Sequence, residues 1–200
     1  NDLINNTNKP SKLIDNLFAN KKSSPFSIVR LAAHFYEIPK AIKYVKKIKK
    51  KGYKVFLNLM QSSNKNEKDF KKVIDIIKNS KAVDAIYFAD SLGSMKPIDI
   101  KEKCFFIKKY WNKGFGIHAH NNCNLAIKNS IKAIECGATW IDTTILGMGR
   151  GAGNAATEKI IKENTYFKKK YNLKPLAALS KNVFIGLKTK YEWGASTSYA

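Results

Sequence analysis

The sequence predicts an α/β fold built on a parallel β-sheet, because strand-like and helix-like segments alternate along the chain. Five apolar runs rich in β-branched and aromatic residues begin 27, 30, 29 and 26 residues apart. They cover residues 28–35, 55–60, 85–89, 114–120 and 140–146. A repeat of about 30 residues is typical of βαβ units, whose right-handed crossovers make the sheet parallel. This periodicity leaves two architectures open, a doubly wound sheet and part of a (β/α)8 barrel.

Helix-like segments connect the five runs. Pro39 and Gly52 bracket the first, as expected for proline at the start of a helix and glycine just beyond its end. Its apolar residues recur three and four positions apart, which predicts one buried face. The second helix contains the apolar positions 70, 73, 74 and 77, the third begins at Pro97, and the fourth covers 125–136.

The two ends of the chain depart from this repeat. Residues 1–27 are rich in Asn, Lys and Ser around one apolar patch, which predicts a short helix. The repeat stops after residue 162, and residues 173–191 have a helical pattern. We therefore divide the chain into an α/β domain over 1–162 and a helical C-terminal extension over 163–200.

The length and charge narrow the function classes. The 200 residues carry a formal charge of +22, with 35 Lys and only 2 Arg. Exposed positions accept Lys readily, so this charge is interpreted as a lysine-coated surface. RNA-binding modules interleave basic residues with surface aromatics, and the lysine clusters here lack that arrangement, so no nucleic-acid partner is expected. Where Lys is the default cation, Arg30 and Arg150 stand out as bidentate ligands for anions.

The cysteines and the apolar segments indicate the cellular compartment in which the protein is expected. Three scattered cysteines without a CxxC pair suit neither a disulfide framework nor a zinc site, and they fit a reducing compartment. No apolar run reaches the 18 or more residues of a membrane span, and no signal-peptide pattern is present. We expect a cytoplasmic protein that does not bind membranes. The first residue is Asn1 and the length is below the ~250 residues of a whole barrel, so a fragment is expected.

Polar side chains follow the predicted strands, at the edge where parallel α/β folds gather their functional groups. His34 follows the first strand, Asp90 and Ser91 the third, and His118 with His120 end the fourth. A glycine-rich segment from 147 to 154 follows the fifth. Asp90 and Ser91 have an ordinary alternative role as caps of the helix that begins at Pro97.

The histidine pair is the most informative motif. In a strand, residues two apart project to the same face, so both imidazoles can converge on one metal ion such as Mn, Fe or Zn. The alternative is two unconnected histidines at a strand end. Two histidines do not complete a metal site, so a carboxylate must come from Asp90 or from outside the chain.

The glycine-rich segment allows three interpretations. It matches the dinucleotide fingerprint GxGxxG poorly, because no acidic residue follows at the expected distance. It could be a flexible turn from strand to helix. It could also let the backbone pass close to a metal-bound anion, with Arg150 binding a carboxylate or phosphate and Asn154 lending an oxygen to the ion.

Residues 116–161, GIHAHNNCNLAIKNSIKAIECGATWIDTTILGMGRGAGNAATEKII, resemble the HMG-CoA lyase-like, or DRE-TIM metallolyase, superfamily, and the GRGAGN loop resembles its aldolase branch. The segments IVRLAAHF, FLNLMQSS and YFADSLGSM resemble its fourth, fifth and sixth barrel strands. The resemblance covers about residues 28–161 and implies strands four to eight of a (β/α)8 TIM barrel. Residues 1–162 would then be the C-terminal part of a catalytic barrel.

The resemblance also implies a metal site. His118 and His120 would bind a divalent cation, Mn²⁺ first and Mg²⁺ or Zn²⁺ as alternatives, and Asn154 matches an asparagine that completes the site in some members. The remaining ligand, an aspartate after the first barrel strand, has no counterpart in these 200 residues. Its absence again indicates a fragment, whose activity would require the N-terminal barrel strands.

The activity implied is metal-assisted carbon–carbon bond cleavage or formation next to a 2-oxo acid, through a pyruvate enolate. Arg150 would neutralise a substrate carboxylate, and His34, Asp90 and Ser91 would line the same catalytic rim. Two alternatives remain: Claisen condensation of the isopropylmalate-synthase type with an acyl-CoA, and an inactive barrel acting as a basic binding protein. The expected partner is a small 2-oxo acid, and a homo-oligomer is compatible with the sequence.

Overall fold

A computed structural model describes residues 10–194 as an α/β fold with one parallel sheet. Its strands follow in the order β1-β2-β3-β4-β5, and the sheet is open at β1 and β5 within the described residues. The strands are β1 Ile28–His34, β2 Lys54–Met60, β3 Ala85–Asp90, β4 Phe115–Ala119 and β5 Trp140–Ile141. The parallel sheet predicted from the 30-residue repeat is confirmed.

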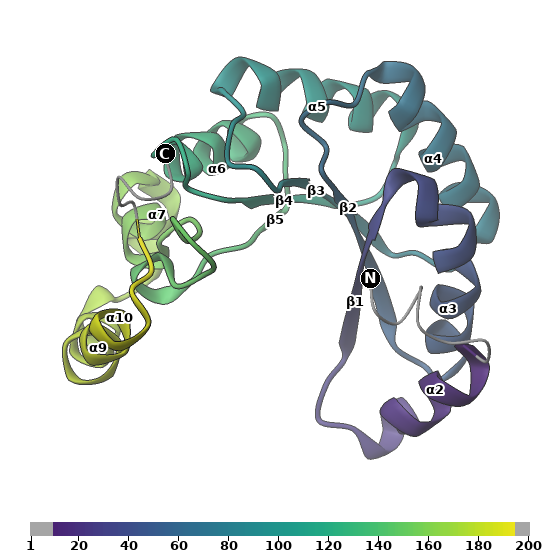
Figure 1. Ribbon diagram of the computed structural model, residues 1–200, viewed down its shortest axis with the longest axis horizontal. Helices are drawn as coiled ribbons and strands as arrows, with labels where there is room; N and C mark the ends of the chain where they lie inside the picture. The colour runs from purple at the N-terminus through teal and green to yellow at the C-terminus, as the bar shows by residue number, and fades with distance from the viewer. Residues whose placement is uncertain (1–9, 195–200) are drawn as a thin grey trace. The chain divides into compact units, whose positions relative to one another are not determined.

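The chain divides into two compact units, and the described part of the first comprises residues 10–89 and 105–115. Its helices α2 (Pro10–Leu17), α3 (Ile38–Lys50) and α4 (Glu67–Ser80) lie on one side of β1 and β2 (Figure 1). Short 3-10 helices occupy Lys21–Ser23 and Phe35–Glu37.

Periodic apolar residues explain the helices of the first unit. The stripe of α3 is buried and Pro39 lies in its first turn, so both expectations for this helix are confirmed. In α4, Asn66 accepts a hydrogen bond from Asp69 N, and Phe70 is fully buried. The register pairs Val29 with Val55, one residue into each of the first two strands.

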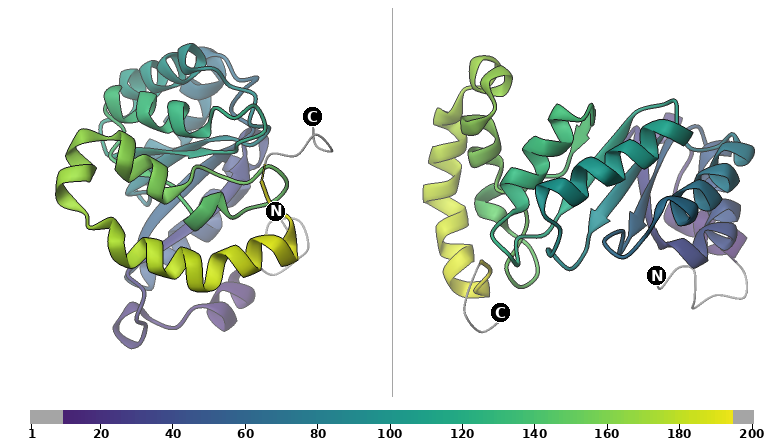
Figure 2. Two further views of the ribbon diagram at one scale, coloured as in Figure 1. Left: turned by 90° about the vertical axis from the view of Figure 1, so that its left-hand side faces the viewer. Right: turned by 90° about the horizontal axis from the view of Figure 1, so that it is seen from above.

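The second unit comprises residues 90–104 and the described residues from 116 to 194. It contains β4, β5 and α6 (Ala126–Glu135), and α5 (Pro97–Tyr110) has residues in both units. Helices α7 (Thr157–Glu163) and α8 (Thr165–Lys170) follow the glycine-rich segment. The last helices, α9 (Leu173–Leu179), a π-helical turn (Ser180–Phe184) and α10 (Ile185–Tyr191), form one continuous rod (Figure 2).

The fifth predicted strand is much shorter than expected. The apolar run over 140–146 predicts a strand throughout, but β5 ends at Ile141. Thr144 instead forms a parallel bridge with Ala156, and Ile145–Gly147 is a 3-10 helix in which Leu146 has a φ of +50°. The segment after Asn154 returns beside Thr144, where Thr144 N donates to Ala155 O and Thr157 N donates to Thr144 O.

Among residues 10–194, no helix is long and apolar enough to cross a membrane. The last part of the predicted C-terminal extension, residues 195–200, lies outside the described residues.

Candidate metal and active site

His118 and His120 lie side by side at the end of β4. Their ring centroids are 5.0 Å apart and the ring planes are nearly perpendicular. The alternation of a strand explains this placement, because residues 118 and 120 project to the same face. The structure therefore brings together the two imidazoles that the sequence singles out.

Asp142 orients the first of these histidines. Its Oδ2 lies 2.8 Å from His118 Nδ1. Ile117 pairs with Ile141 in the parallel register of β4 and β5, so His118 and Asp142, the next residue of each segment, lie side by side. Because a carboxylate accepts, Nδ1 carries the proton and the lone pair of His118 is on Nε2, as in many histidine metal ligands whose other nitrogen is bonded to a carboxylate.

Burial keeps His120 neutral. Desolvation lowers the pKa of His120, and the charges of His118 and Arg150 lower it further, while a hydrogen bond with the backbone of Gly153 raises it. The net pKa lies below the ordinary value of a histidine. At pH 7 the ring is therefore in the uncharged form that binds metal ions.

Asn154 contributes an oxygen beside these rings. It forms an antiparallel bridge with His120, and its Nδ2 donates to Met148 O at 3.0 Å, which fixes the orientation of the amide. Asn154 Oδ1 is buried and has no hydrogen-bond partner. A buried acceptor without a partner costs free energy unless something else binds it. Imidazole nitrogen and amide oxygen are both ligand types for Mn²⁺, Mg²⁺ or Zn²⁺, to different degrees, so the chemistry of these three residues fits the predicted ion.

The glycines of the segment 147–154 allow this backbone path. A Cβ on Gly149 would lie 2.4 Å from Asn154 Nδ2, and one on Gly153 would lie 2.1 Å from Gly147 O. Gly153 also has a φ of +81°, which favours glycine. The glycines are therefore required for the close approach of the loop to Asn154, and the passage of this backbone beside a metal-bound anion stays a prediction.

The end of the C-terminal rod holds the same loop. Trp193 is 6% exposed, and its indole N–H donates to Leu146 O at 3.0 Å. Gly194 N donates to Gly151 O at 3.0 Å. These two bonds attach the helical extension to the glycine-rich segment.

Asp90 shapes the loop that follows β3. Its carboxylate is fully buried and accepts from Ser94 N at 3.0 Å and Met95 N at 3.2 Å, in the loop before α5 and not in the first turn of that helix. Burial raises the pKa of Asp90, and these backbone hydrogen bonds oppose the rise. The carbonyl of Asp90 accepts from His120 N at 3.3 Å, so this loop also supports the second histidine. Ser91 follows it and is half-buried.

The other two predicted catalytic residues differ in their surroundings. Arg150 is exposed at the tip of the glycine-rich segment, and its charge acts on His120. His34 belongs to the first unit, where it caps the 3-10 helix Phe35–Glu37 and stacks on Tyr36 with ring centroids 5.5 Å apart. A catalytic role of His34 stays a prediction.

The family model for HMGL-like proteins matches residues 23–183 of this chain. The chain belongs to the HMGL-like family. The superfamily resemblance and the partial barrel predicted from the sequence are thereby confirmed, with the barrel not closed within the described residues.

Named HMGL-like relatives are aldolases and lyases. A 4-hydroxy-2-oxovalerate aldolase from Carboxydothermus hydrogenoformans is 38% identical over 136 residues, which are 67% of this chain and 40% of that protein. The N-terminal domain of a candidate aldolase from Bacteroides vulgatus superposes with a TM-score of 0.75 at 32% identity, over 86% of this chain and 57% of that one. HMG-CoA lyase from Bacillus subtilis shares the fold, with a TM-score of 0.70 at 15% identity over 87% of this chain and 67% of that one.

This chain spans about two fifths of the length of the 4-hydroxy-2-oxovalerate aldolases that it matches. HMGL-like aldolases generally use a divalent metal. In the part of the chain that the structure describes, no three His, Cys, Asp or Glu side chains form a metal-binding group, so His118, His120 and Asn154 are the donors on hand.

Sequence reasoning missed Asp142 and Trp193. Asp142 had a signal: it follows β5 at the position level with His118, so the strand register alone pairs them. Trp193 had none, because its contact with Leu146 joins positions 47 residues apart.

Proposed function

We propose that this chain is the metal-binding part of a divalent-metal-dependent aldolase that cleaves or forms a carbon–carbon bond next to a 2-oxo acid. The observation that carries the proposal is the pair of adjacent imidazoles, one oriented by Asp142 and the other kept neutral by burial. The aldolase relatives support the reaction class. Activity would require the further barrel strands that a longer protein of this family contains.

The residues of this chain would hold the ion. His118 presents Nε2 because Asp142 binds its Nδ1, and His120 presents an uncharged ring. Asn154 presents the oxygen that otherwise has no partner. A bound divalent ion supplies Lewis acidity, which stabilises the negative charge of an enolate. Mn²⁺ suits this mixed nitrogen and oxygen set, and Mg²⁺ or Zn²⁺ is the alternative.

Arg150 would bind the substrate. Its guanidinium is exposed in the glycine-rich segment and can donate two hydrogen bonds to a carboxylate in a bidentate arrangement. The bound carboxylate would then orient the 2-oxo acid. The close packing of the loop leaves no room for larger side chains at Gly149 and Gly153. Ser91 and Asp90 lie at the end of β3 and are proposed to line the rim, Asp90 through the loop that it shapes.

Metal analysis tests this proposal. In the full-length protein purified with Mn²⁺, we expect His118→Ala/His120→Ala to lose the bound metal, because the two rings supply two of the three donors in this chain. His34→Ala is the matched control for metal content, since His34 is the third histidine of the sequence and is not among the proposed metal ligands. Equal metal content in the wild type and the double variant would overturn the proposal.

The reaction is tested separately from the metal. With Mn²⁺, the full-length protein should release pyruvate from 4-hydroxy-2-oxo acids. Consumption of acetyl-CoA with a 2-oxo acid, and no pyruvate release, would instead assign the Claisen reaction.

A further inference from the structure

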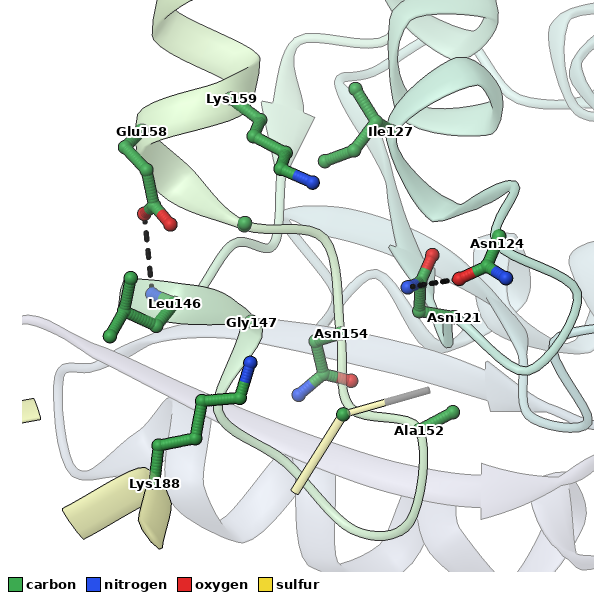
Figure 3. A pocket seen from close by; sticks show the side chains of 12 residues that line it. Asn121, Asn124, Ile127, Leu146, Gly147, Ala152, Asn154, Glu158, Lys159 and Lys188 are labelled. Atoms are coloured by element: carbon green, nitrogen blue, oxygen red, sulfur yellow. Dashed lines mark hydrogen bonds between the residues drawn. The ribbon is translucent and has the colours of Figure 1, made fainter. Parts of the chain in front are cut away.

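A cavity lies beside the glycine-rich segment, within the second unit. It has a volume of about 340 Å³, in the ~300–1,000 Å³ range of small-molecule sites. Figure 3 shows that α6, α7, α10 and two loops all contribute side chains. The polar side chains that line it include Asn121, Asn124, Asn154, Glu158, Lys159 and Lys188.

Two exposed lysine side chains line this cavity, and neither forms an ion pair within residues 10–194. Lys159 reaches toward it from α7 and Lys188 from α10 (Figure 3). Within residues 10–194, neither side chain has a hydrogen bond or an ion pair. Lysines elsewhere in the chain do pair with carboxylates, as Lys49 does with Asp84 at 2.7 Å.

The one carboxylate among the described lining residues is already engaged. Glu158 Oε2 accepts from Leu146 N at 3.2 Å and so supports the turn in which Leu146 has a positive φ (Figure 3). The cavity lining thus carries two positive charges and one negative charge. Its net charge of +1 favours an anionic occupant.

Two amide side chains also line the cavity. Asn121 Oδ1 accepts from Ala126 N at 3.2 Å, and Asn121 Nδ2 donates to Asn124 Oδ1 at 3.4 Å. This pairing orients both amides, with the Asn124 oxygen toward Asn121 and its nitrogen away from the two lysines (Figure 3). The lysines are therefore the groups of this lining that would bind an anion.

We propose that this cavity binds a small organic anion, whose phosphate or carboxylate group lies between Lys159 and Lys188. Lysine is a common phosphate ligand and acts as a point charge, so two lysines on separate helices accept either group. The volume exceeds that of a bare ion, which indicates an organic molecule carrying the anionic group. Asn154 lines the cavity as well, so the occupant would contact the segment that carries the candidate metal ligand.

Calorimetric titration of the full-length protein tests this site. The probes are glycerol 3-phosphate, inorganic phosphate and malonate at about 0.15 M salt, where charges beyond ~8 Å are screened. We expect Lys159→Met/Lys188→Met to weaken binding of the preferred probe tenfold or more. Stronger binding of glycerol 3-phosphate identifies a phosphate ester, and stronger binding of malonate identifies a carboxylate.

A matched pair of substitutions removes the same charge elsewhere. Lys162→Met on α7 and Lys190→Met on α10 lie on the same two helices, are exposed and do not line the cavity. This control should change affinity by less than twofold. Equal loss in both double variants, or no binding of any probe, would overturn the proposal.

The site is distinguishable from the metal site. The titration is repeated in His118→Ala/His120→Ala without added metal, where the anion should still bind with wild-type affinity. Loss of anion binding in that variant would assign the anion to the metal site instead, and would leave the aldolase proposal untouched.

Discussion

Asp142 links the orientation of a metal ligand to a single hydrogen bond, which makes it a sensitive test of the site. Asp142→Asn keeps the size of the side chain but replaces the anionic acceptor of His118 Nδ1. Loss of such a partner commonly lowers metal affinity ~10–100-fold. We expect a fall of that size in Mn²⁺ affinity, measured by titration of the full-length protein, with little change in melting temperature.

The control for Asp142 is Asp99→Asn. Asp99 Oδ2 accepts from Lys96 N at the start of α5 and belongs to the same unit. It should leave Mn²⁺ affinity unchanged. Unchanged affinity in Asp142→Asn would show that His118 does not depend on this carboxylate.

Gly149 tests the close packing of the loop on Asn154. In Gly149→Ala, the new methyl group would lie 2.4 Å from Asn154 Nδ2, so the amide must move. We expect Mn²⁺ affinity to fall about tenfold, a loss of ~1.4 kcal/mol. Gly186→Ala in α10 is the control, because no atom lies within 4 Å of its added Cβ. It should stabilise the helix by ~0.5–1 kcal/mol and leave metal binding unchanged.

At the scale of elements, Asp84 joins three segments of the first unit. Its carboxylate binds Lys49 of α3 at 2.7 Å and accepts from Val55 N of β2 at 2.7 Å, just before β3 begins. Burial raises the pKa of Asp84, but Lys49 and the Val55 N–H outweigh burial and lower it below the ordinary 3.8. The charged form is therefore the stabilising one.

The pH dependence follows from that direction. Asp84→Asn should lower the free energy of unfolding by ~1.5–3 kcal/mol at pH 7, the usual contribution of hydrogen bonds to a charged group. The difference should persist down to about pH 3.8, the ordinary pKa, and disappear as the pH falls through the lower pKa of the folded protein. Thermal melts from pH 7 to 3 measure it. Asp75→Asn, which breaks an exposed pair with Lys71, should change stability by less than ~0.5 kcal/mol.

The C-terminal rod is expected to support the loop through Trp193. Trp193→Phe keeps a ring but removes the hydrogen bond to Leu146 O, which should cost ~1 kcal/mol of stability. Because that bond supports the glycine-rich loop, Mn²⁺ affinity should fall too. Tyr191→Ala, with 64% of its surface exposed, is the control. A loss of stability with unchanged metal affinity would limit Trp193 to a structural role.

Local patterns predicted most of these elements. Apolar periodicity located α3 and α4, and the end of β4 and its two histidines were predicted because side-chain alternation is a local property. The end of β5 could not be predicted, since Thr144 pairs with Ala156 across a glycine-rich turn. Trp193 could not be predicted for the same reason, because its contact joins segments far apart in the sequence, whereas Asp142 becomes evident once the register of β4 and β5 is known.

At the scale of the whole molecule, burial differs sharply between strands. All six residues of β3 are buried, as expected for a strand inside a parallel sheet, whereas β1 is exposed at several positions, with Ile28 at 39%. Since the chain spans about 40% of its aldolase relatives, we expect further strands of a longer protein to cover β1. The net charge of +22 is explained without an anionic partner, because lysines on exposed helix faces account for most of it.

Activity should depend on the barrel strands that this chain does not include. Residues 1–200 offer only two imidazoles and one amide as metal donors, so they should bind Mn²⁺ more weakly than the full-length protein. They also contain no assigned proton-transfer group. Pyruvate release from 4-hydroxy-2-oxo acids, followed by a coupled assay with Mn²⁺, should be at least ~10³-fold slower for residues 1–200, the middle of the ~10²–10⁴-fold contribution of one general acid or base. Addition of the separately expressed N-terminal strands should restore part of the rate. Equal turnover by residues 1–200 alone and by the full-length protein would place the whole catalytic apparatus within this chain.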